Sequence, residues 1–164
     1  MFALPASAAM WLLIAALPIS IFVAWNDMRA MKIPNLAVLA LMSGFAVLGL
    51  IAFPFEQYLW QWSHFLVVLV IGFVLNIIGV FGAGDAKFAA AAAPYIMLAD
   101  LQVLAWVFTV CVVAGFVTHR IAKHSPLRRL VPEWESWTSG RRFPMGLPLG
   151  MTLVTYLILA ATQA

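Results

Sequence analysis

Long apolar runs joined by short polar segments restrict this chain to very few folds. Only 9% of its 164 residues are charged and 65% are hydrophobic, whereas soluble domains contain about 25% charged and about 45–50% apolar residues. A helix that crosses a bilayer needs about 20 mainly apolar residues, and the lipid interior tolerates only backbone whose polar groups are bonded within the protein. The sequence therefore predicts an all-α, polytopic integral membrane protein that forms one domain over residues 1–164.

Six transmembrane helices are expected. Apolar runs of sufficient length predict four of them, at about Ala8–Trp25, Leu36–Phe53, Phe65–Phe81 and Pro144–Ala161. The stretch Ala86–Thr118 is too long for one ordinary span and short for two. Asp100 interrupts this stretch, and Pro94 bends or breaks any helix that contains it. Dividing it next to Asp100 predicts two further spans, Ala86–Leu98 and Leu101–Thr118.

The basic residues predict the orientation of these spans. Lys and Arg are enriched in cytoplasmic loops, and with six spans all nine lie in or beside the first, third and fifth loops. With five spans, the fifth loop, which is the most basic, would lie on the opposite side from the first. Both termini are therefore expected outside the cytoplasm.

The fifth loop, at about residues 119–143, is the only long polar segment. It contains Pro126, Pro132 and Gly140, so it is not expected to form one continuous helix. Trp134 and Trp137 lie three residues apart in it, and tryptophan is enriched at membrane interfaces. The loop is either a connector that lies on the lipid headgroups or a flap that contacts a substrate.

Two aspartates lie at the predicted cytoplasmic ends of the spans. Asp27 closes the first apolar run, and Asp85 lies in Gly82-Ala83-Gly84-Asp85 between two others. An acid costs roughly 2.5–3.5 kcal/mol at the centre of a membrane helix, and less near the interface, so an acid there indicates a function. Two close carboxyl groups tend to share a proton and can divide acid and base roles. The pair therefore predicts hydrolysis of a peptide bond, with one carboxylate activating water and the protonated one donating to the carbonyl.

Helix ends and neighbouring residues refine this hypothesis. A helix macrodipole disfavours a carboxylate at the C-terminal end, where Asp27 is predicted, and favours one at the N-terminal end, where Asp85 is predicted. We therefore expect Asp27 to hold the shared proton more often. Gly82 and Gly84 either give the backbone unusual angles and room for a peptide, or only let helices pack closely. Lys87 either reaches the lipid headgroups or approaches the substrate backbone.

Other chemistries find little support in the sequence. It has no His-Glu-x-x-His motif, a single cysteine (Cys111) and three histidines without metal-ligand spacing, so no metal site and no cofactor are expected. The excess of basic residues is attributed to cytoplasmic loops, not to nucleic-acid binding. One alternative remains, a small transporter or pump subunit that uses Asp27 and Asp85 as a proton relay. A relay should cross the membrane, whereas both acids are predicted on one side of it.

Three segments together resemble a known family. Residues Gly82–Lys87 fit the pattern G-x-G-D-x-K, Asp27–Asn35 consists of an aspartate, a basic loop and I-P-N, and Phe143–Gly150 is rich in Pro and Gly at the start of the last span. These segments resemble those of the type IV prepilin peptidases, which are membrane aspartyl proteases, and the resemblance covers about Trp11 to Ala161. It implies that a short basic leader is cleaved from pilin precursors at the cytoplasmic face of the bacterial inner membrane. Asp27 and Asp85 match the catalytic pair, and Gly82 and Gly84 match motif residues.

The chain also departs from the large members of that family. Those carry a cytoplasmic insert with paired Cys-x-x-Cys motifs, whereas this chain has one cysteine and no room for the insert. N-methyltransferase activity is therefore not expected. The size resembles the short peptidases of tight-adherence (Flp) pilus systems and, more distantly, archaeal preflagellin peptidases, which implies prepilins or pseudopilins as substrates. A non-catalytic pilus assembly factor is a further alternative, for which the two aspartates would tolerate substitution.

Overall fold

The computed structural model describes residues 2–140 and 142–163. It contains six α-helices, with the bounds α1 Ala6–Ala30, α2 Asn35–Ala52, α3 Phe55–Ile77, α4 Ala83–Ala92, α5 Leu101–Lys123 and α6 Gly146–Ala161. Four short 3-10 turns accompany them, at η1 Ala93–Tyr95, η2 Leu98–Asp100, η3 Pro126–Leu130 and η4 Glu135–Trp137. No strand occurs in the described part of the chain, so the predicted all-α class is confirmed.

Proline defines where the first three helices begin. Pro5, Pro34 and Pro54 directly precede α1, α2 and α3, and Pro5 and Pro34 are in an extended conformation. Proline cannot donate a backbone hydrogen bond, and its fixed φ suits the start of a helix. At the other end of α1, Met31 adopts a left-handed φ of 49° and donates its N–H to the carbonyl of Asp27, which ends the helix.

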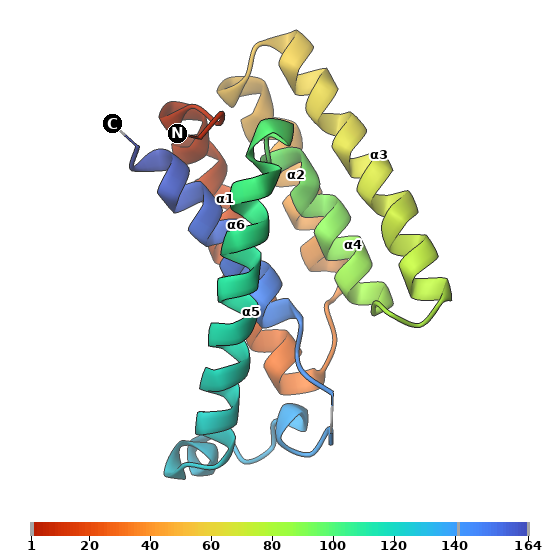
Figure 1. Cartoon of the computed structure of the whole chain (residues 1–164), viewed down its shortest axis with the longest axis vertical. Helices are drawn as coiled ribbons and strands as arrows, with labels where there is room; N and C mark the ends of the chain where they lie inside the picture. The colour runs from red at the N-terminus through yellow and green to blue at the C-terminus, as the bar shows by residue number, and fades with distance from the viewer. Residues whose placement is uncertain (1, 141, 164) are drawn as a thin grey trace.

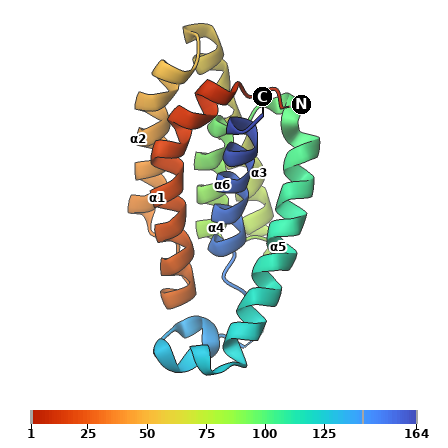
Figure 2. The same cartoon turned by 90° about the vertical axis from the view of Figure 1, so that its left-hand side faces the viewer.

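The helices form an upright bundle in which α4 and α6 are central (Figure 1). α1 packs along α6 and α2, α4 packs against α2, α3 and α6, and α5 packs on α6. Figure 2 shows α1 and α5 on either side of α6, with α4 behind it. The buried core between these helices includes Leu12, Phe45, Phe88, Tyr95 and Tyr156.

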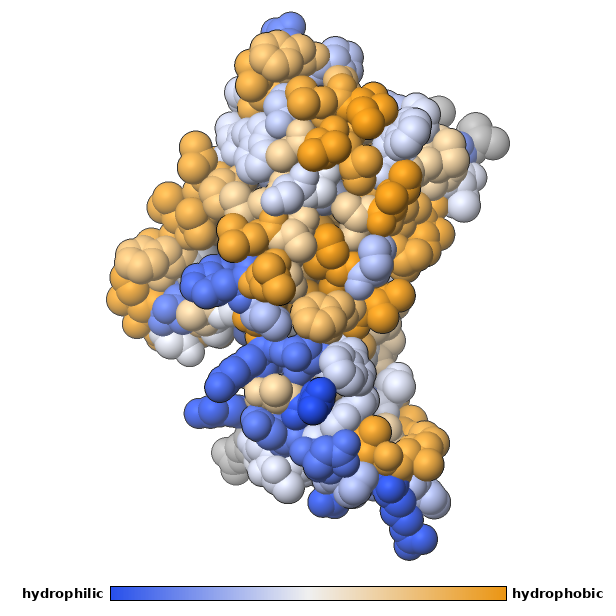
Figure 3. Space-filling model, turned by 180° about the vertical axis from the view of Figure 1, so that it is seen from behind, coloured by the Kyte–Doolittle hydropathy of each residue, from blue (hydrophilic) through white to orange (hydrophobic). Residues whose placement is uncertain are grey.

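Four segments are long and apolar enough to cross a membrane, by length and composition: α1, α2, α3 and the stretch Leu98–Lys123. Helix α6 is apolar but shorter, and α4 has only 10 residues. Hydrophilic side chains gather at the end of the molecule formed by residues 124–140, below a broad apolar band (Figure 3). These features make the chain a multi-pass membrane protein. Six spans and the orientation of the termini stay predictions, and Arg141, one of the basic residues behind that orientation, lies outside the described residues.

The two ends of the chain meet at the pole opposite that hydrophilic end (Figures 1 and 2). The carboxyl group of Asp100 is buried there and accepts hydrogen bonds from the N–H groups of Ala3 and Leu4, at 2.7 and 3.2 Å, and from the hydroxyl of Tyr156 at 2.7 Å. The side-chain amide of Gln163 accepts from the N–H of Phe2 and donates to the carbonyl of Leu4. Asp100 therefore has a structural place distant from the two aspartates at the other end.

Several predicted boundaries shift in the structure. Helix α3 begins at Phe55, well before the predicted Phe65, and α1 and α4 extend far enough for Asp27 and Asp85 to lie inside them. The stretch from Ala86 is divided as predicted, with α5 beginning at Leu101, although α4 ends earlier because Pro94 enters a 3-10 turn. Helix α5 continues to Lys123, so His119, predicted in the loop, is a buried helical residue.

Candidate active site

A cavity of about 850 Å³ lies at the hydrophilic end of the bundle, and both Asp27 and Asp85 line it. We call it the aspartate cavity. Its walls come from the end of α1, the segment Met31–Pro34, the segment Gly79–Gly82 with the start of α4, and Arg142, Phe143 and Met145 before α6. Chain segments far apart in the sequence therefore bring the two predicted catalytic residues to one space.

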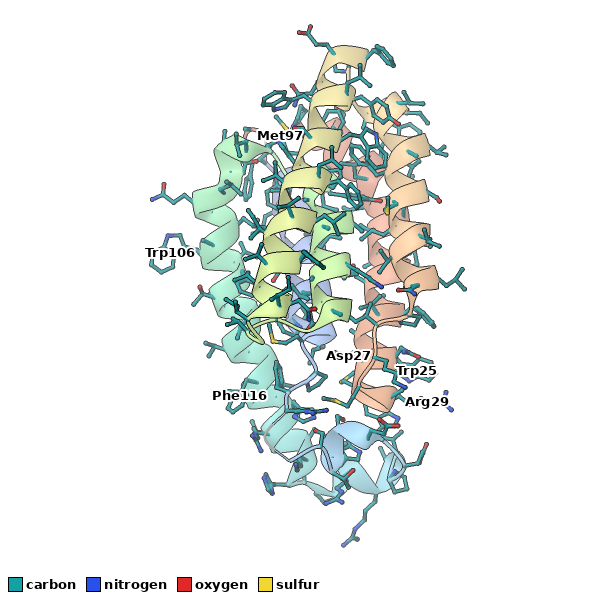
Figure 4. The ribbon with its side chains drawn as sticks, turned by 90° about the vertical axis from the view of Figure 1, so that its right-hand side faces the viewer. Trp25, Asp27, Arg29, Met97, Trp106 and Phe116 are labelled. Atoms are coloured by element: carbon teal, nitrogen blue, oxygen red, sulfur yellow. The ribbon has the colours of Figure 1, made fainter. Side chains whose placement is uncertain are left out.

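Asp27 lies in the last turn of α1 and faces the interior, whereas Trp25 and Arg29 of the same turn point outward (Figure 4). Its side chain is only 5% exposed. The backbone N–H of Gly146 donates a hydrogen bond of 2.6 Å to Asp27 Oδ2. Gly146 is the first residue of α6, so this carboxyl group also lies at a helix N-terminus.

Gly146 can occupy this place only because it has no side chain. A Cβ atom there would lie 2.9 Å from Asp27 Cβ and 3.0 Å from Asp27 Oδ2, closer than unbonded atoms ordinarily approach. Gly146 could not be identified as a site residue from its own position in the sequence. The only signal was its position in the Pro- and Gly-rich segment that resembles the family.

Asp85 lies in the first turn of α4, half-buried, and outside the four long apolar segments. The pKa of its carboxyl group is raised to about 6. Burial is the largest cause and the negative charge of Asp27 adds to it, while a hydrogen bond with the Gly82 backbone opposes the shift. A Cβ on Gly82 would lie 2.5 Å from Asp85 Oδ2, so the absence of a side chain at Gly82 gives this carboxyl group its space.

The two carboxyl groups share the cavity without bonding to each other. Among the hydrogen bonds of the described residues, none joins Asp27 to Asp85, and each carboxyl lies instead beside the backbone at the start of a different helix. The expectation that Asp27 holds the proton rested on its place at the C-terminal end of α1. The N-terminal end of α6 also lies beside Asp27 and favours a carboxylate there, which opposes the effect of the C-terminal end of α1. The helix ends therefore no longer indicate which aspartate holds the proton.

The motif glycines serve close approach, not unusual backbone angles. Among the described glycines only Gly79 and Gly140 have positive φ, so the expectation of special angles at Gly82 and Gly84 is wrong. Gly84 packs against Ile33, whose Cβ would lie 3.3 Å from a Cβ added at Gly84. This contact holds the α1–α2 segment beside the start of α4, where both form walls of the aspartate cavity.

Lys87 and two other cationic side chains have defined places near this end of the bundle. Lys87 is exposed and donates a 3.1 Å hydrogen bond from Nζ to Asn35 Oδ1, which ties α4 to the first residue of α2. Lys32 and Arg142, which the sequence analysis did not single out as site residues, line the aspartate cavity. Within the described residues, no group of three or more His, Cys, Asp or Glu side chains is placed to hold a metal ion.

The fifth loop reaches the cavity. Its turn η4 packs on α1, and Arg142 and Phe143 at its end form part of the cavity wall. The end of this loop therefore belongs to the cavity wall, while its role as a connector or a flap stays a prediction.

The model of the type IV leader peptidase family matches residues 8–119 of this chain, which include both aspartates and the glycine motif. Comparisons with curated proteins and with solved structures gave no match.

Proposed function

Because the chain belongs to the type IV leader peptidase family, we propose that it is a membrane aspartic endopeptidase in which Asp27 and Asp85 are the catalytic pair. The observation that carries this proposal is the aspartate cavity, which both carboxyl groups line although they lie 58 positions apart in the sequence. A buried carboxyl beside a second one is the arrangement in which a proton is shared and acid and base roles divide.

The proposed reaction needs only these two groups and water. The ionised carboxylate accepts a proton from a water molecule as the water oxygen attacks the scissile carbonyl carbon. The protonated carboxyl donates its proton to the carbonyl oxygen, and a tetrahedral intermediate forms. The C–N bond then breaks as the leaving nitrogen takes up the proton that the base had accepted, and a hydroxyl of the intermediate returns a proton to the other carboxylate, which restores the starting pair. The bond from Gly146 N–H to Asp27 and the glycine-lined space at Asp85 hold the two carboxyls on the cavity wall.

The substrates proposed are prepilins or pseudopilins, including those of the Flp type, with cleavage at the cytoplasmic face of the inner membrane. The cavity lies at the end of the bundle that carries the basic loop, which by the distribution of Lys and Arg is the cytoplasmic end. A leader cleaved there would remain on the side where the precursor is synthesised.

The proton-relay alternative finds less support. A relay should connect the two sides of the membrane, and the buried acid nearest the opposite pole is Asp100. Its carboxyl accepts three hydrogen bonds from Ala3, Leu4 and Tyr156, which account for it as a structural group. The peptidase proposal uses both cavity aspartates and requires no acid at that pole.

Co-expression with candidate pilin precursors tests the proposal. Asp27→Asn and Asp85→Asn should each abolish leader removal while the protein still inserts, because an amide cannot act as a carboxylate base. Glu56→Gln is the matched control, since Glu56 is an exposed acid at the other end of the molecule. If either aspartate variant processes precursor at the wild-type rate, the pair is not catalytic and the assembly-factor alternative is favoured.

A further inference from the structure

The imidazole of His119 is buried in a way that the proposed reaction does not explain. Its side chain is 5% exposed, and neither Nδ1 nor Nε2 has a hydrogen-bond partner in the structure. A buried imidazole without polar partners is unusual, because unpaired buried polar groups are costly. What His119 does make is contact through its ring.

Two aromatic side chains enclose that ring. Trp137 stacks on it, with centroids 5.1 Å apart and planes at 19°, and Phe143 meets it edge-on at 5.7 Å and 78°. Trp137 is itself fixed by the hydrogen bond from its Nε1 to the carbonyl of Val131 and by stacking on Trp134. His119 therefore joins η4, on one side, to the segment that leads into α6, on the other.

This junction is directly connected to the catalytic group. Phe143 is three residues before Gly146, whose N–H bonds to Asp27. One turn before His119 on α5, Gly115 approaches Phe143 and Leu147, both 3.6 Å from the Cβ that Gly115 lacks. Gly115 and His119 are both buried, so this face of α5 contacts the polypeptide on both sides of Gly146.

We propose that His119 is a positioning residue, which together with Trp137 and Phe143 forms an aromatic clamp that holds the start of α6 against Asp27. This inference rests on the proposed function, in which the Asp27 carboxyl is one of the reacting pair. The imidazole acts through its aromatic faces and edges and not through its nitrogens. Loss of the clamp frees Phe143 and Met145 from the cavity wall and separates the Gly146 amide from the carboxyl.

The proposal is tested with three variants in a Cys111→Ala background. His119→Ala removes the clamp, His119→Phe keeps an aromatic ring without nitrogens, and His124→Ala is the control, an exposed histidine directly after α5. The interaction energy of one such aromatic pair corresponds to a change in rate of up to roughly tenfold. We expect His119→Ala to lower kcat per folded molecule about tenfold, and His119→Phe and His124→Ala to stay within about threefold of the parent.

A second readout does not need cleavage. In the same background, Met145→Cys introduces a thiol beside Gly146, and its rate of alkylation reports whether the segment is held. His119→Ala should raise that rate several-fold, and His119→Phe should not. A merely structural histidine would lower the yield of folded protein but leave kcat per folded molecule unchanged, and that result would overturn the proposal. Equal damage by His119→Phe and His119→Ala would overturn it too, because the nitrogens would then be the acting groups.

The two proposals fail in different ways. If wild-type protein and Asp27→Asn cleave precursor equally poorly, the peptidase assignment fails, while the alkylation rates still decide whether the clamp exists. If cleavage depends on Asp27 but neither kcat nor the alkylation rate responds to His119→Ala, the clamp is wrong and the peptidase stands.

Discussion

At neutral pH the Asp85 carboxyl group is above its pKa and therefore ionised, although its burial in the fold disfavours the charged form. Its pKa is raised from 3.8 to about 6, chiefly by burial. Between these values the folded protein binds more protons than the unfolded chain, so the free energy of unfolding falls as pH rises from about 4 to about 6 and stays lower above that. The ionised form of Asp85 is therefore maintained at the expense of stability, a cost that the proposed catalytic role would explain.

Replacing this carboxyl group should make the protein more stable where the wild type is ionised. We expect Asp85→Asn to raise the melting temperature at about pH 8 by roughly 2–4 °C, the shift that corresponds to about 1 kcal/mol in a chain of this size, and to change it little at about pH 4. Thermal unfolding of purified protein in detergent at both pH values measures the difference. Glu56→Gln, at an exposed acid, should show no such dependence; an equal shift at both pH values would contradict the explanation.

Gly146 offers an equally specific change. A methyl group there would lie 2.9 Å from Asp27 Cβ, so the carboxyl or the start of α6 must move. We expect Gly146→Ala to lower precursor cleavage at least tenfold, with a loss of stability of about 1–3 kcal/mol that is typical of overpacking. Gly115→Ala is the control, since its new Cβ would make only ordinary contacts of 3.6 Å. Wild-type cleavage by Gly146→Ala would mean that the amide contact to Asp27 is dispensable.

Helices α2 and α4 are joined at their first turns by the bond from Lys87 to Asn35. Because both side chains are exposed, we expect Lys87→Met and Asn35→Ala each to lower the free energy of unfolding by only about 0.5–1 kcal/mol. In the double variant the two losses of stability should not add, because both remove the same hydrogen bond. A double-mutant cycle measures this departure from additivity. Cleavage should persist in all three; a loss of more than tenfold would instead place Lys87 at the substrate.

The helices differ in how far their bounds could be predicted. α1, α2 and α6 follow from apolar length and flanking prolines, which are local signals. The early start of α3 was missed because Gln57, Gln61 and His64 interrupt its apolar run. Gln61 is fully buried and its amide donates to the carbonyl of Ile96. That partner lies 35 residues away, so nothing near Gln61 in the sequence shows that a polar residue fits there.

The residues of the candidate site also differ in how far sequence could predict them. Asp27, Asp85 and the glycine motif could be read from spacing and from the cost of acids near lipid. The amide of Gly146 and the ring of His119 could not, because each acts through contacts between distant segments. Gly82 and Gly84 could be singled out from the motif, but not which of their properties the fold uses, since sequence shows where a glycine is and not whether its φ is positive.

The orientation of the whole bundle is open to direct measurement. Thr138 in the fifth loop and Glu56 at the opposite pole are both exposed. In a Cys111→Ala background, an impermeant thiol reagent added to intact cells should label Glu56→Cys and spare Thr138→Cys, because basic loops stay in the cytoplasm. Both should react once the inner membrane is permeabilised. Labelling of Thr138→Cys alone in intact cells would invert the arrangement and move the aspartate cavity to the other face.

The hydrogen bond between Gly146 and Asp27 joins residues 119 positions apart. During translation, α1 enters the bilayer long before α6 is made, and for that interval its aspartate has no amide donor. The aspartate cavity also lacks the wall formed by Arg142, Phe143 and Met145 until the same moment. For the peptidase proposed here, a nascent copy is therefore inert toward the membrane proteins inserted around it, and cleavage begins only when α6 docks beside α1.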